Sequence, residues 1–369
     1  MSRPQSVLLM ARQLDQGGSE RQLAEMAKAL DRSLFSPHVG AFRPDGLRWR
    51  ELESAGIPLI HFPVPSITSV KGAFAIAGYV RRHGIRLVHT FDTPANVYGV
   101  PSARMAGAPV VLSSQRAHRD LAPRFRYLLR LTDLLADGIV VNCEFIRRHL
   151  MEDEGVPARR IHLCHNGVDV DVFHALGRCR PEALSDASLV VGVVCALRPE
   201  KGLTALLEAF ALVRARQAGM KLAIVGSGAC AEELHARAAA LGILQDCVFQ
   251  PAVSNVAPWL RGIDIFVLPS LTEALSNSLM EAMSCGCCVV ASRVGGNPEL
   301  VADSETGLLF DRGDVSGLAL ALNRLIDQPS WRAELGCNAS RLMRRSFRLD
   351  LAARRVEEVY AALLSRVPA

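Results

Sequence analysis

The stretch that decides the fold is residues 269–300, Pro-Ser-Leu-Thr-Glu273-Ala-Leu-Ser-Asn277-Ser-Leu-Met-Glu281-Ala-Met-Ser-Cys-Gly286-Cys-Cys-Val-Val-Ala-Ser-Arg-Val-Gly295-Gly296-Asn-Pro-Glu299-Leu. The apolar run 265–268 before it predicts a buried strand, and Ser276 or Asn277 is a good N-cap for a helix after it. Such a turn presents backbone N–H groups and the positive end of a helix to an anion. Glu273 and Glu281 beside the turn can accept hydrogen bonds from hydroxyl groups. Phosphate together with sugar hydroxyls describes a nucleotide sugar, the ligand that this stretch favours.

Short apolar runs alternate with amphipathic stretches along the whole chain, which predicts parallel α/β architecture. The runs that read as strands are 7–14, 38–42, 59–62, 87–91, 110–114, 138–142 and 161–164 in the first half, and 189–197, 222–225, 247–251, 263–268, 287–291 and 307–310 in the second. An irregular segment at about 168–188 separates the halves. We therefore expect an α/β protein with two doubly wound, Rossmann-like domains facing each other across a cleft lined by the carboxyl ends of both sheets.

Length and composition agree with two globular domains. A chain of 369 residues is too long for one ordinary core, and half of its residues are hydrophobic while 21% are charged. The first residues do not read as a signal peptide, and no apolar stretch reaches the roughly 18–20 residues that a membrane-spanning helix needs. We expect a cytoplasmic protein.

Positive charge is concentrated in the first half of the chain. Residues 1–180 hold 24 Lys and Arg against 17 Asp and Glu, whereas the rest hold 18 against 20. The arginines cluster at 81–82, 116–130, 147–148 and 159–160. A solvated surface is the simplest interpretation; the sharper hypothesis is peripheral contact with anionic lipid at the inner membrane face, or with an acidic acceptor. Nucleic acid is disfavoured, because aromatic residues are few and do not alternate with the arginines.

Ten cysteines occur, mostly inside apolar runs, and we expect small buried side chains without disulfides. Cys285 and Cys288 form a C-x-x-C pattern, but no second pair follows at the spacing of a zinc site.

The segment Arg198-Pro-Glu-Lys201-Gly202 follows a predicted strand and precedes a predicted helix at 203–213. Two cations at a strand end can neutralise a diphosphate, Arg as a bidentate fork and Lys as a point charge. The alternative is a pair of solvated charges beside a loop. The downstream acids Glu273 and Glu281 favour the phosphate site.

A glycine pair, Gly17-Gly18, follows the first predicted strand and would let a phosphate or sugar approach backbone N–H groups closely. Ser19 and Gln22 have capping-box spacing, which predicts a helix start there. An ordinary βα turn is the alternative.

A second glycine segment, Gly226-Ser-Gly228-Ala-Cys-Ala231, imitates the dinucleotide fingerprint, and Asp246 lies about 20 residues on. An NAD-linked oxidoreductase is therefore the obvious rival. However, Asp246 precedes the next predicted strand, whereas the ribose-binding acid belongs at the carboxyl end of a strand. We interpret the segment as a tight turn near a donor nucleotide.

Taken in order, these pieces resemble the retaining glycosyltransferases of the GT-B fold, in particular family four with its E-x7-E signature. The resemblance covers most of the chain, through Gly17-Gly18-Ser19-Glu20, His165-Asn166-Gly167-Val168-Asp169, Arg198-Pro-Glu-Lys201-Gly202, Gly226-Ser-Gly228, the segment from Glu273 to Glu281, and Gly295-Gly296-Asn-Pro-Glu299. It implies that Arg198 and Lys201 bind the donor phosphates. It assigns Glu273 to the hydroxyls of the transferred sugar and Glu281 to the ribose. The further donor-binding positions that it implies are Gly17, Gly18, Gly226, Val253, Leu275, Ser276, Asn277 and Ser278.

The acceptor side departs from the family pattern. Many members place a histidine just after a strand of the first domain, and the matching position here is Gln115, with Arg116 beside it. His118, three residues on, is our candidate for the catalytic role, and His89 is another. The departure leaves a degenerate, non-catalytic protein as an alternative.

Asp169-Val-Asp171 is a D-x-D pattern of the kind that binds divalent metal in other glycosyltransferases. Here it follows the His165–Val168 piece at the linker, a context typical of GT-B proteins that need no metal. We expect no metal and no other cofactor.

We predict a retaining hexosyltransferase that moves a sugar from a nucleotide diphosphate sugar, with a UDP-sugar favoured, to a hydroxyl of a carbohydrate or lipid-linked acceptor in cell-surface polysaccharide or glycolipid assembly. The expected domains are an acceptor-binding domain at 1–170, a donor-binding domain at 171–348 and a final helix at 349–369 that packs back on the first domain. The alternatives are a non-catalytic nucleotide-sugar-binding protein and, with less support, an NAD-dependent oxidoreductase.

Overall fold

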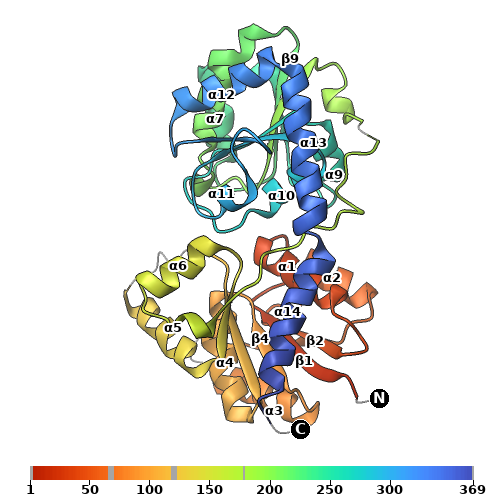
Figure 1. Ribbon diagram of the computed structural model, residues 1–369, viewed down its shortest axis with the longest axis vertical. Helices are drawn as coiled ribbons and strands as arrows, with labels where there is room; N and C mark the ends of the chain where they lie inside the picture. Colours follow the sequence, from red (N-terminus) through yellow and green to blue (C-terminus); the bar gives the residue numbers. More distant parts are fainter. Residues whose placement is uncertain (1–2, 65–69, 118–122, 178, 368–369) are drawn as a thin grey trace. The chain divides into compact units, whose positions relative to one another are not determined.

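The computed structural model describes residues 3–64, 70–117, 123–177 and 179–367 (Figure 1). The chain divides into two compact units, unit 1 with residues 1–167 and 349–369, and unit 2 with residues 168–348. Val168 N donates to the carbonyl oxygen of Phe347 at 2.9 Å, so the two points where the chain enters and leaves unit 2 lie side by side.

The described part of unit 1 forms a seven-stranded parallel sheet in the order β3-β2-β1-β4-β5-β6-β7. Its strands are β1 (Gln5–Ala11), β2 (Phe35–Ala41), β3 (Leu59–His61), β4 (Leu87–Thr90), β5 (Val110–Gln115), β6 (Gly138–Val141) and β7 (Ile161–Leu163). Its helices are α1 (Gly18–Ala29), α2 (Leu47–Ser54), α3 (Val70–Arg82), α4 (Thr93–Ala106), α5 (Pro123–Leu135), α6 (Glu144–Glu152) and α14 (Leu349–Leu364), with a short turn at Ala158–Arg160.

Helices cover both faces of this sheet, because successive side chains of a strand point to opposite sides. Val7 and Leu9 of β1 belong to a core that includes Tyr360 of α14 and residues of α1. Leu8 and Met10 of β1 belong to a second core, closed by α3 and α4.

The described part of unit 2 forms a six-stranded parallel sheet in the order β10-β9-β8-β11-β12-β13. Its strands are β8 (Leu189–Val194), β9 (Met220–Val225), β10 (Cys247–Gln250), β11 (Ile265–Leu268), β12 (Cys288–Ser292) and β13 (Leu308–Phe310). Its helices are α7 (Leu203–Val213), α8 (Ala231–Ala240), α9 (Ala257–Gly262), α10 (Asn277–Ser284), α11 (Asn297–Leu300), α12 (Val315–Asp327) and α13 (Pro329–Ser346), with short turns at Glu182–Leu184, Pro199–Lys201, Arg214–Arg216 and Leu244–Asp246.

Each sheet reverses its direction of winding beside its first strand. β1 lies between β2 and β4, and β8 lies between β9 and β11. Open α/β sheets bind ligands at this topological switch point, outside the carboxyl ends of the strands. In unit 2 the loops after β8 and β11 carry Arg198, Lys201 and Glu273, so the fold gathers these three predicted residues at the switch point.

The doubly wound α/β architecture of both units confirms the predicted fold class, and every run that the sequence marked as a strand overlaps a strand of the structure. No disulfide joins any of the ten cysteines. No helix within the described ranges combines the length and the apolar composition that crossing a bilayer requires.

Candidate functional site

An ion pair joins the two loops at the switch point of unit 2. Lys201 ends the turn after β8, and its Nζ pairs with Oε1 of Glu273 in the loop after β11. The hydroxyl of Ser270 donates to the same Oε1 at 2.8 Å. Both partners are largely buried, with 19% and 10% of their side chains exposed. Oε1 thus anchors the carboxylate, while Oε2 accepts no hydrogen bond from the described residues and can accept one from a ligand hydroxyl.

Arg198 lies at the start of the same turn and is 63% exposed. Its guanidinium is 3.7 Å from the carboxylate of Glu200, a solvent-exposed contact that contributes little stability. The backbone N–H of Lys201 donates to the carbonyl of Arg198 at 3.0 Å, which closes the turn. Two cations therefore stand three residues apart at the carboxyl end of β8, an arrangement suited to a diphosphate.

Glycines allow the loops after β9 and β12 to contact the loops after β8 and β11. Gly226, after β9, has φ of 151°, and a Cβ there would lie 1.8 Å from the carbonyl oxygen of Cys195. Gly295, after β12, has φ of 54°, and its Cβ would lie 1.9 Å from the carbonyl oxygen of Glu273. Gly296 N also donates to the carbonyl of Ala274 at 2.7 Å. Gly226 and Gly295 are therefore required at these positions, because only glycine lets the backbone come so close to a neighbouring carbonyl group.

The helix after Glu273 begins where the sequence predicts. Ser276 is the N-cap of α10, and its Oγ accepts from Leu279 N at 3.4 Å. Of the predicted donor-binding positions, Ser276, Asn277 and Ser278 thus form the start of α10, and Leu275 lies just before it. Glu281 lies further along the same helix and is only 4% exposed, with an interaction partner inside the protein.

Val253, a predicted donor-binding position, lies in the loop after β10. That loop is tied to the one after β9, because Ala252 N donates to Oγ of Ser227 at 2.9 Å. The predicted residues of unit 2 thus lie in the loops after β8, β9, β10 and β11 of one parallel sheet and in α10.

Gly17 and Gly18 lie in unit 1, where α1 begins at Gly18 with Gly17 as N-cap. The helix start predicted there is confirmed, but Ser19 and Gln22 do not form its capping box. The helix starts earlier than that pairing requires, and Oε2 of Glu20 accepts from Gly17 N at 2.7 Å instead. The buried amide of Gln22 exchanges hydrogen bonds of 3.0 and 3.1 Å with the backbone of Gly167.

The acceptor-side histidine His118 lies outside the described residues. His89 is a core residue: its Nδ1 is 2.6 Å from the hydroxyl of Tyr360 and its Nε2 is 2.7 Å from Oγ of Ser114. Burial lowers the pKa of His89 well below its usual range, so the ring is neutral. With both nitrogens engaged, His89 holds α14 against β4 and β5.

Arg116, which follows Gln115 at the end of β5, is also packed inside unit 1. Its guanidinium donates to Oδ1 of Asn166 at 2.8 Å and lies 4.7 Å from the centre of the Phe91 ring. Burial lowers the pKa of Arg116 to about 10.

Asp169 and Asp246, which the sequence analysis considered for metal binding and for dinucleotide binding, each have hydrogen-bond or ion-pair partners nearby in the chain or the fold. Oδ1 of Asp169 accepts from the backbone N–H groups of Asp171 and Val172 at 3.0 and 3.3 Å, which makes the D-x-D a turn. Asp246 precedes β10 and pairs with Arg214 at 2.6 Å, away from any carboxyl end of a strand. The dinucleotide interpretation of Gly226 therefore lacks its ribose-binding acid.

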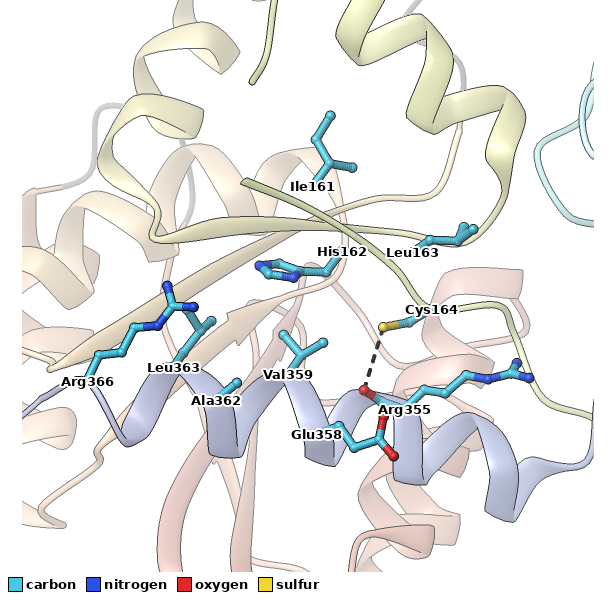
Figure 2. Close-up of a pocket in the computed structure, with 10 residues that line it drawn as sticks. All are labelled: Ile161, His162, Leu163, Cys164, Arg355, Glu358, Val359, Ala362, Leu363 and Arg366. Carbon is cyan, nitrogen blue, oxygen red and sulfur yellow. Dashed lines mark hydrogen bonds between the residues drawn. The ribbon is translucent and has the colours of Figure 1, made fainter. Parts of the chain in front are cut away.

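A pocket of about 410 Å³ opens in unit 1 between β7 and α14. Figure 2 shows His162 of β7 facing the side chains of Val359 on α14 and of Arg366 just beyond that helix. None of the predicted site residues lines this pocket, so it is separate from the candidate donor site.

Comparison with known proteins agrees with the geometry. The family model described as glycosyl transferases group 1 matches residues 188–328, and the one described as glycosyltransferase family 4 matches residues 16–172. This chain belongs to the group 1 glycosyltransferases. The two matched ranges lie in unit 2 and mainly in unit 1, respectively.

Two curated relatives of this glycosyltransferase are informative. One is the GDP-mannose-dependent alpha-(1-6)-phosphatidylinositol monomannoside mannosyltransferase of Mycolicibacterium smegmatis, 33% identical over 64% of this chain and 66% of the relative. The other is the D-inositol 3-phosphate glycosyltransferase of Acidothermus cellulolyticus, 31% identical over 69% of this chain and 57% of the relative. The match thus spans less than two thirds of either relative's length.

A solved structure supports the GT-B fold. The Anabaena protein HepE, crystallised in complex with UDP, superimposes with a TM-score of 0.82 at 22% identity, over 97% of this chain and all of HepE.

Proposed function

We propose that this glycosyltransferase moves a sugar from a nucleotide diphosphate sugar to an acceptor hydroxyl with retention of configuration. The observation that carries the proposal is the carboxylate of Glu273. Its Oε1 is anchored by Lys201 and Ser270, and its Oε2 accepts nothing from the described residues. One anchored and one available oxygen suits a residue that orients a sugar hydroxyl.

In the proposed reaction, the bond between the sugar's anomeric carbon and the diphosphate oxygen breaks while the acceptor oxygen bonds to the same face of that carbon. The acceptor proton passes to the departing phosphate, so the products are a glycosylated acceptor and a nucleoside diphosphate. Lys201 and Arg198 stabilise the negative charge that develops on the leaving group. No metal ion is needed in this scheme, so transfer is expected to persist in EDTA.

UDP is the proposed nucleotide, as the sequence analysis favoured. The UDP complex of HepE supports it only through the shared fold. The mannosyltransferase relative is GDP-mannose-dependent, which makes GDP-mannose the second candidate donor.

The proposed acceptor is a carbohydrate or lipid-linked hydroxyl compound of cell-surface polysaccharide or glycolipid assembly, met in the cytoplasm at the inner membrane face. The names of both curated relatives contain an inositol compound, phosphatidylinositol monomannoside in one and D-inositol 3-phosphate in the other. Inositol phosphates are therefore the first acceptors to try.

The test combines thermal shift with turnover. UDP, GDP, ADP, their sugar conjugates and NAD are compared as ligands, and a ligand at about 100 times its Kd should add roughly 2.7 kcal/mol to the free energy of unfolding. Release of nucleoside diphosphate is then followed with inositol phosphates and with membrane lipid extracts. Glu281→Gln should weaken stabilisation by the nucleotide, whereas Asp246→Asn, a matched change at a paired surface acid, should not.

The outcomes separate the alternatives. Stabilisation by one nucleoside diphosphate and its sugar, with acceptor-dependent release, supports the proposal. Donor binding without transfer to any acceptor supports a non-catalytic binder. Stabilisation by NAD alone, lost in Asp246→Asn, refutes the proposal.

A further inference from the structure

Large apolar side chains are exposed together on one helical layer of unit 1. α4 packs against both α3 and α5, so these helices form a continuous layer on the sheet (Figure 1). Phe74 of α3 is 62% exposed, Met105 of α4 is 54% exposed and Leu134 of α5 is 69% exposed. Most of the exposed large apolar side chains of the described residues lie in unit 1, which makes this layer unlike the surface of unit 2.

The spacing of these residues shows that they form stripes rather than scattered positions. Tyr127, Leu131 and Leu134 recur at i, i+4 and i+7 and therefore share one face of α5. Val70 and Phe74 do the same on α3, whose opposite face buries Ile76 and Val80. Each stripe points away from the core that the helix covers.

The same helices are basic. α3 and α4 contain no acidic residue, and α5 contains one, Asp133, which is buried. Lys71, Arg81, Arg82 and Arg130 are exposed, and none of them pairs with a carboxylate within the described part of the chain. We call these cations, the stripes on α3 and α5, and Met105 of α4 the basic apolar face.

We propose that the basic apolar face docks on an anionic lipid bilayer, with the apolar stripes entering the interface and the cations contacting lipid phosphates. Interfacial helices combine aromatic and aliphatic side chains with Lys and Arg, and their binding grows with buried apolar area and with attraction to anionic lipid. Exposed apolar patches rimmed by polar residues mark interaction sites for proteins or membranes.

The charge of this face argues against two other occupants, a second copy of this chain and a partner protein. A second copy of this chain would oppose one basic face to another, and like charges across an interface are unfavourable. A partner protein would have to supply acids between apolar contacts spread over three helices, whereas an anionic bilayer supplies both a phosphate plane and an apolar interior. The bilayer is therefore the occupant that matches both properties of the face.

The structure also changes which arginines carry the contact that the sequence analysis suggested. Arg116 lies inside unit 1, and Arg147 pairs with Glu144 at 2.9 Å. Arg119 lies outside the described residues. Arg81, Arg82 and Arg130 lie on the basic apolar face, and the exposed apolar stripes, which the charge pattern did not reveal, add to the proposed contact.

The experiment is cosedimentation of the full chain with vesicles of phosphatidylcholine alone, or mixed equally with phosphatidylglycerol, in the absence of nucleotide. Leu131→Gln/Leu134→Gln removes apolar contact without changing charge. Leu212→Gln/Leu320→Gln is the matched control in unit 2, since both leucines are 65% exposed. Arg81→Gln/Arg82→Gln removes two positive charges and leaves the apolar stripes unchanged.

We expect binding to phosphatidylglycerol vesicles and little binding to phosphatidylcholine. The Leu131/Leu134 change should lower the partition coefficient at least about fivefold at low and high salt. The Arg81/Arg82 change should lower it about tenfold at low salt, and less as salt screens the charges. The unit 2 control should bind like the unaltered chain.

The proposal is overturned if the unaltered chain ignores anionic vesicles, or if the unit 2 control loses as much binding as the Leu131/Leu134 variant. It is also overturned if the chain self-associates in sedimentation velocity and the Leu131/Leu134 change abolishes that association. Because the assay contains no donor, it stands or falls separately from the proposed transferase activity.

Discussion

The ammonium of Lys201 pairs with Oε1 of Glu273 across the topological switch point of unit 2, tying the loop after β8 to the loop after β11. The pair is largely buried and is reinforced by the hydroxyl of Ser270. The cation proposed to bind phosphate and the carboxylate proposed to bind sugar thus hold each other in place. Such preorganisation lowers the cost of orienting a donor.

Replacing Lys201 by Met should separate the catalytic role of this pair from its structural role. The variant leaves a largely buried carboxylate without its cation, which should cost about 1–3 kcal/mol of unfolding free energy. Loss of leaving-group stabilisation should lower kcat about 10²–10³-fold. Urea unfolding and initial-rate kinetics measure the two effects. The double variant Lys201→Met/Glu273→Gln should recover stability but not activity; recovery of both would show that the pair has no catalytic function.

Glu273 and Glu281 should fail in different ways when each is changed to Gln. If Glu273 contacts the transferred sugar, Glu273→Gln weakens binding of the sugar nucleotide but not of the nucleoside diphosphate. If Glu281 contacts the ribose, Glu281→Gln weakens binding of both by a similar factor. Isothermal titration with a nucleoside diphosphate and its sugar conjugate distinguishes these patterns. Equal effects of the two variants on both ligands would contradict the assigned roles.

Gly295 should be intolerant of a side chain because of its contact with the loop of Glu273. Ala at this position combines a φ of 54° with a Cβ 1.9 Å from the carbonyl oxygen of Glu273, so the loop must move. Gly56→Ala is the matched control, since Gly56 has φ of 67° but no atom within 4 Å of its Cβ position. The control should lose about 1 kcal/mol, and Gly295→Ala should lose more, together with sugar-nucleotide affinity. Thermal unfolding of both variants, with and without donor, checks this prediction.

The sequence predicted the sheets well because their signals are local. Apolar runs such as 265–268 are long enough and sharply enough bounded to mark buried parallel strands. Ser276 could be recognised as an N-cap because capping depends only on residues next to it in the sequence. The boundary errors arise where a strand's apolar run continues into a loop, as at 195–197 after β8.

The contacts between loops could not be predicted from the sequence. Nothing local indicates that Oε1 of Glu273 is shared by Lys201 and Ser270, or that Gln22 bonds to Gly167 rather than capping its own helix. These contacts depend on which strands are neighbours in the sheet. The exposure of Leu131 and Leu134 was likewise hidden, because an amphipathic helix with two apolar faces reads as an ordinary core helix.

The hydrogen bond between Tyr360 and His89 predicts a stability difference between two Tyr→Phe changes. Tyr360→Phe leaves Nδ1 of the fully buried His89 without its partner at 2.6 Å, which should cost about 1–3 kcal/mol. Tyr79→Phe removes a similar bond of 2.8 Å to His38, which is half-buried and can be reached by water. Its cost should be smaller. Urea unfolding compares the two, and equal losses would show that burial does not set the cost.

The last prediction concerns Asp92, the N-cap of α4. Its carboxylate accepts from the backbone N–H groups of Arg12 and Ala95, at 2.6 and 2.8 Å. Burial, with a smaller contribution from Glu20, raises the pKa of Asp92 to about 6, against the two hydrogen bonds that lower it. An unfolded Asp titrates near 3.9, so between about pH 4 and 6 the folded state binds more protons than the unfolded state. The contribution of Asp92 to stability must therefore fall as the pH rises through this window.

Asp92→Asn removes that proton linkage. The unfolding free energy of the variant minus that of the unaltered chain should rise from about pH 4 to 6, by roughly 1.4 kcal/mol per unit at most, and then level off. Urea unfolding of both proteins at about pH 4, 5, 6 and 7 measures this difference, in which the titration of other groups cancels. Glu20→Gln, which removes a negative charge that raises the pKa of Asp92, should make the slope of the unaltered chain shallower in the same window. A difference that stays flat across the window would mean that Asp92 is ionised throughout and that its two backbone hydrogen bonds outweigh its burial.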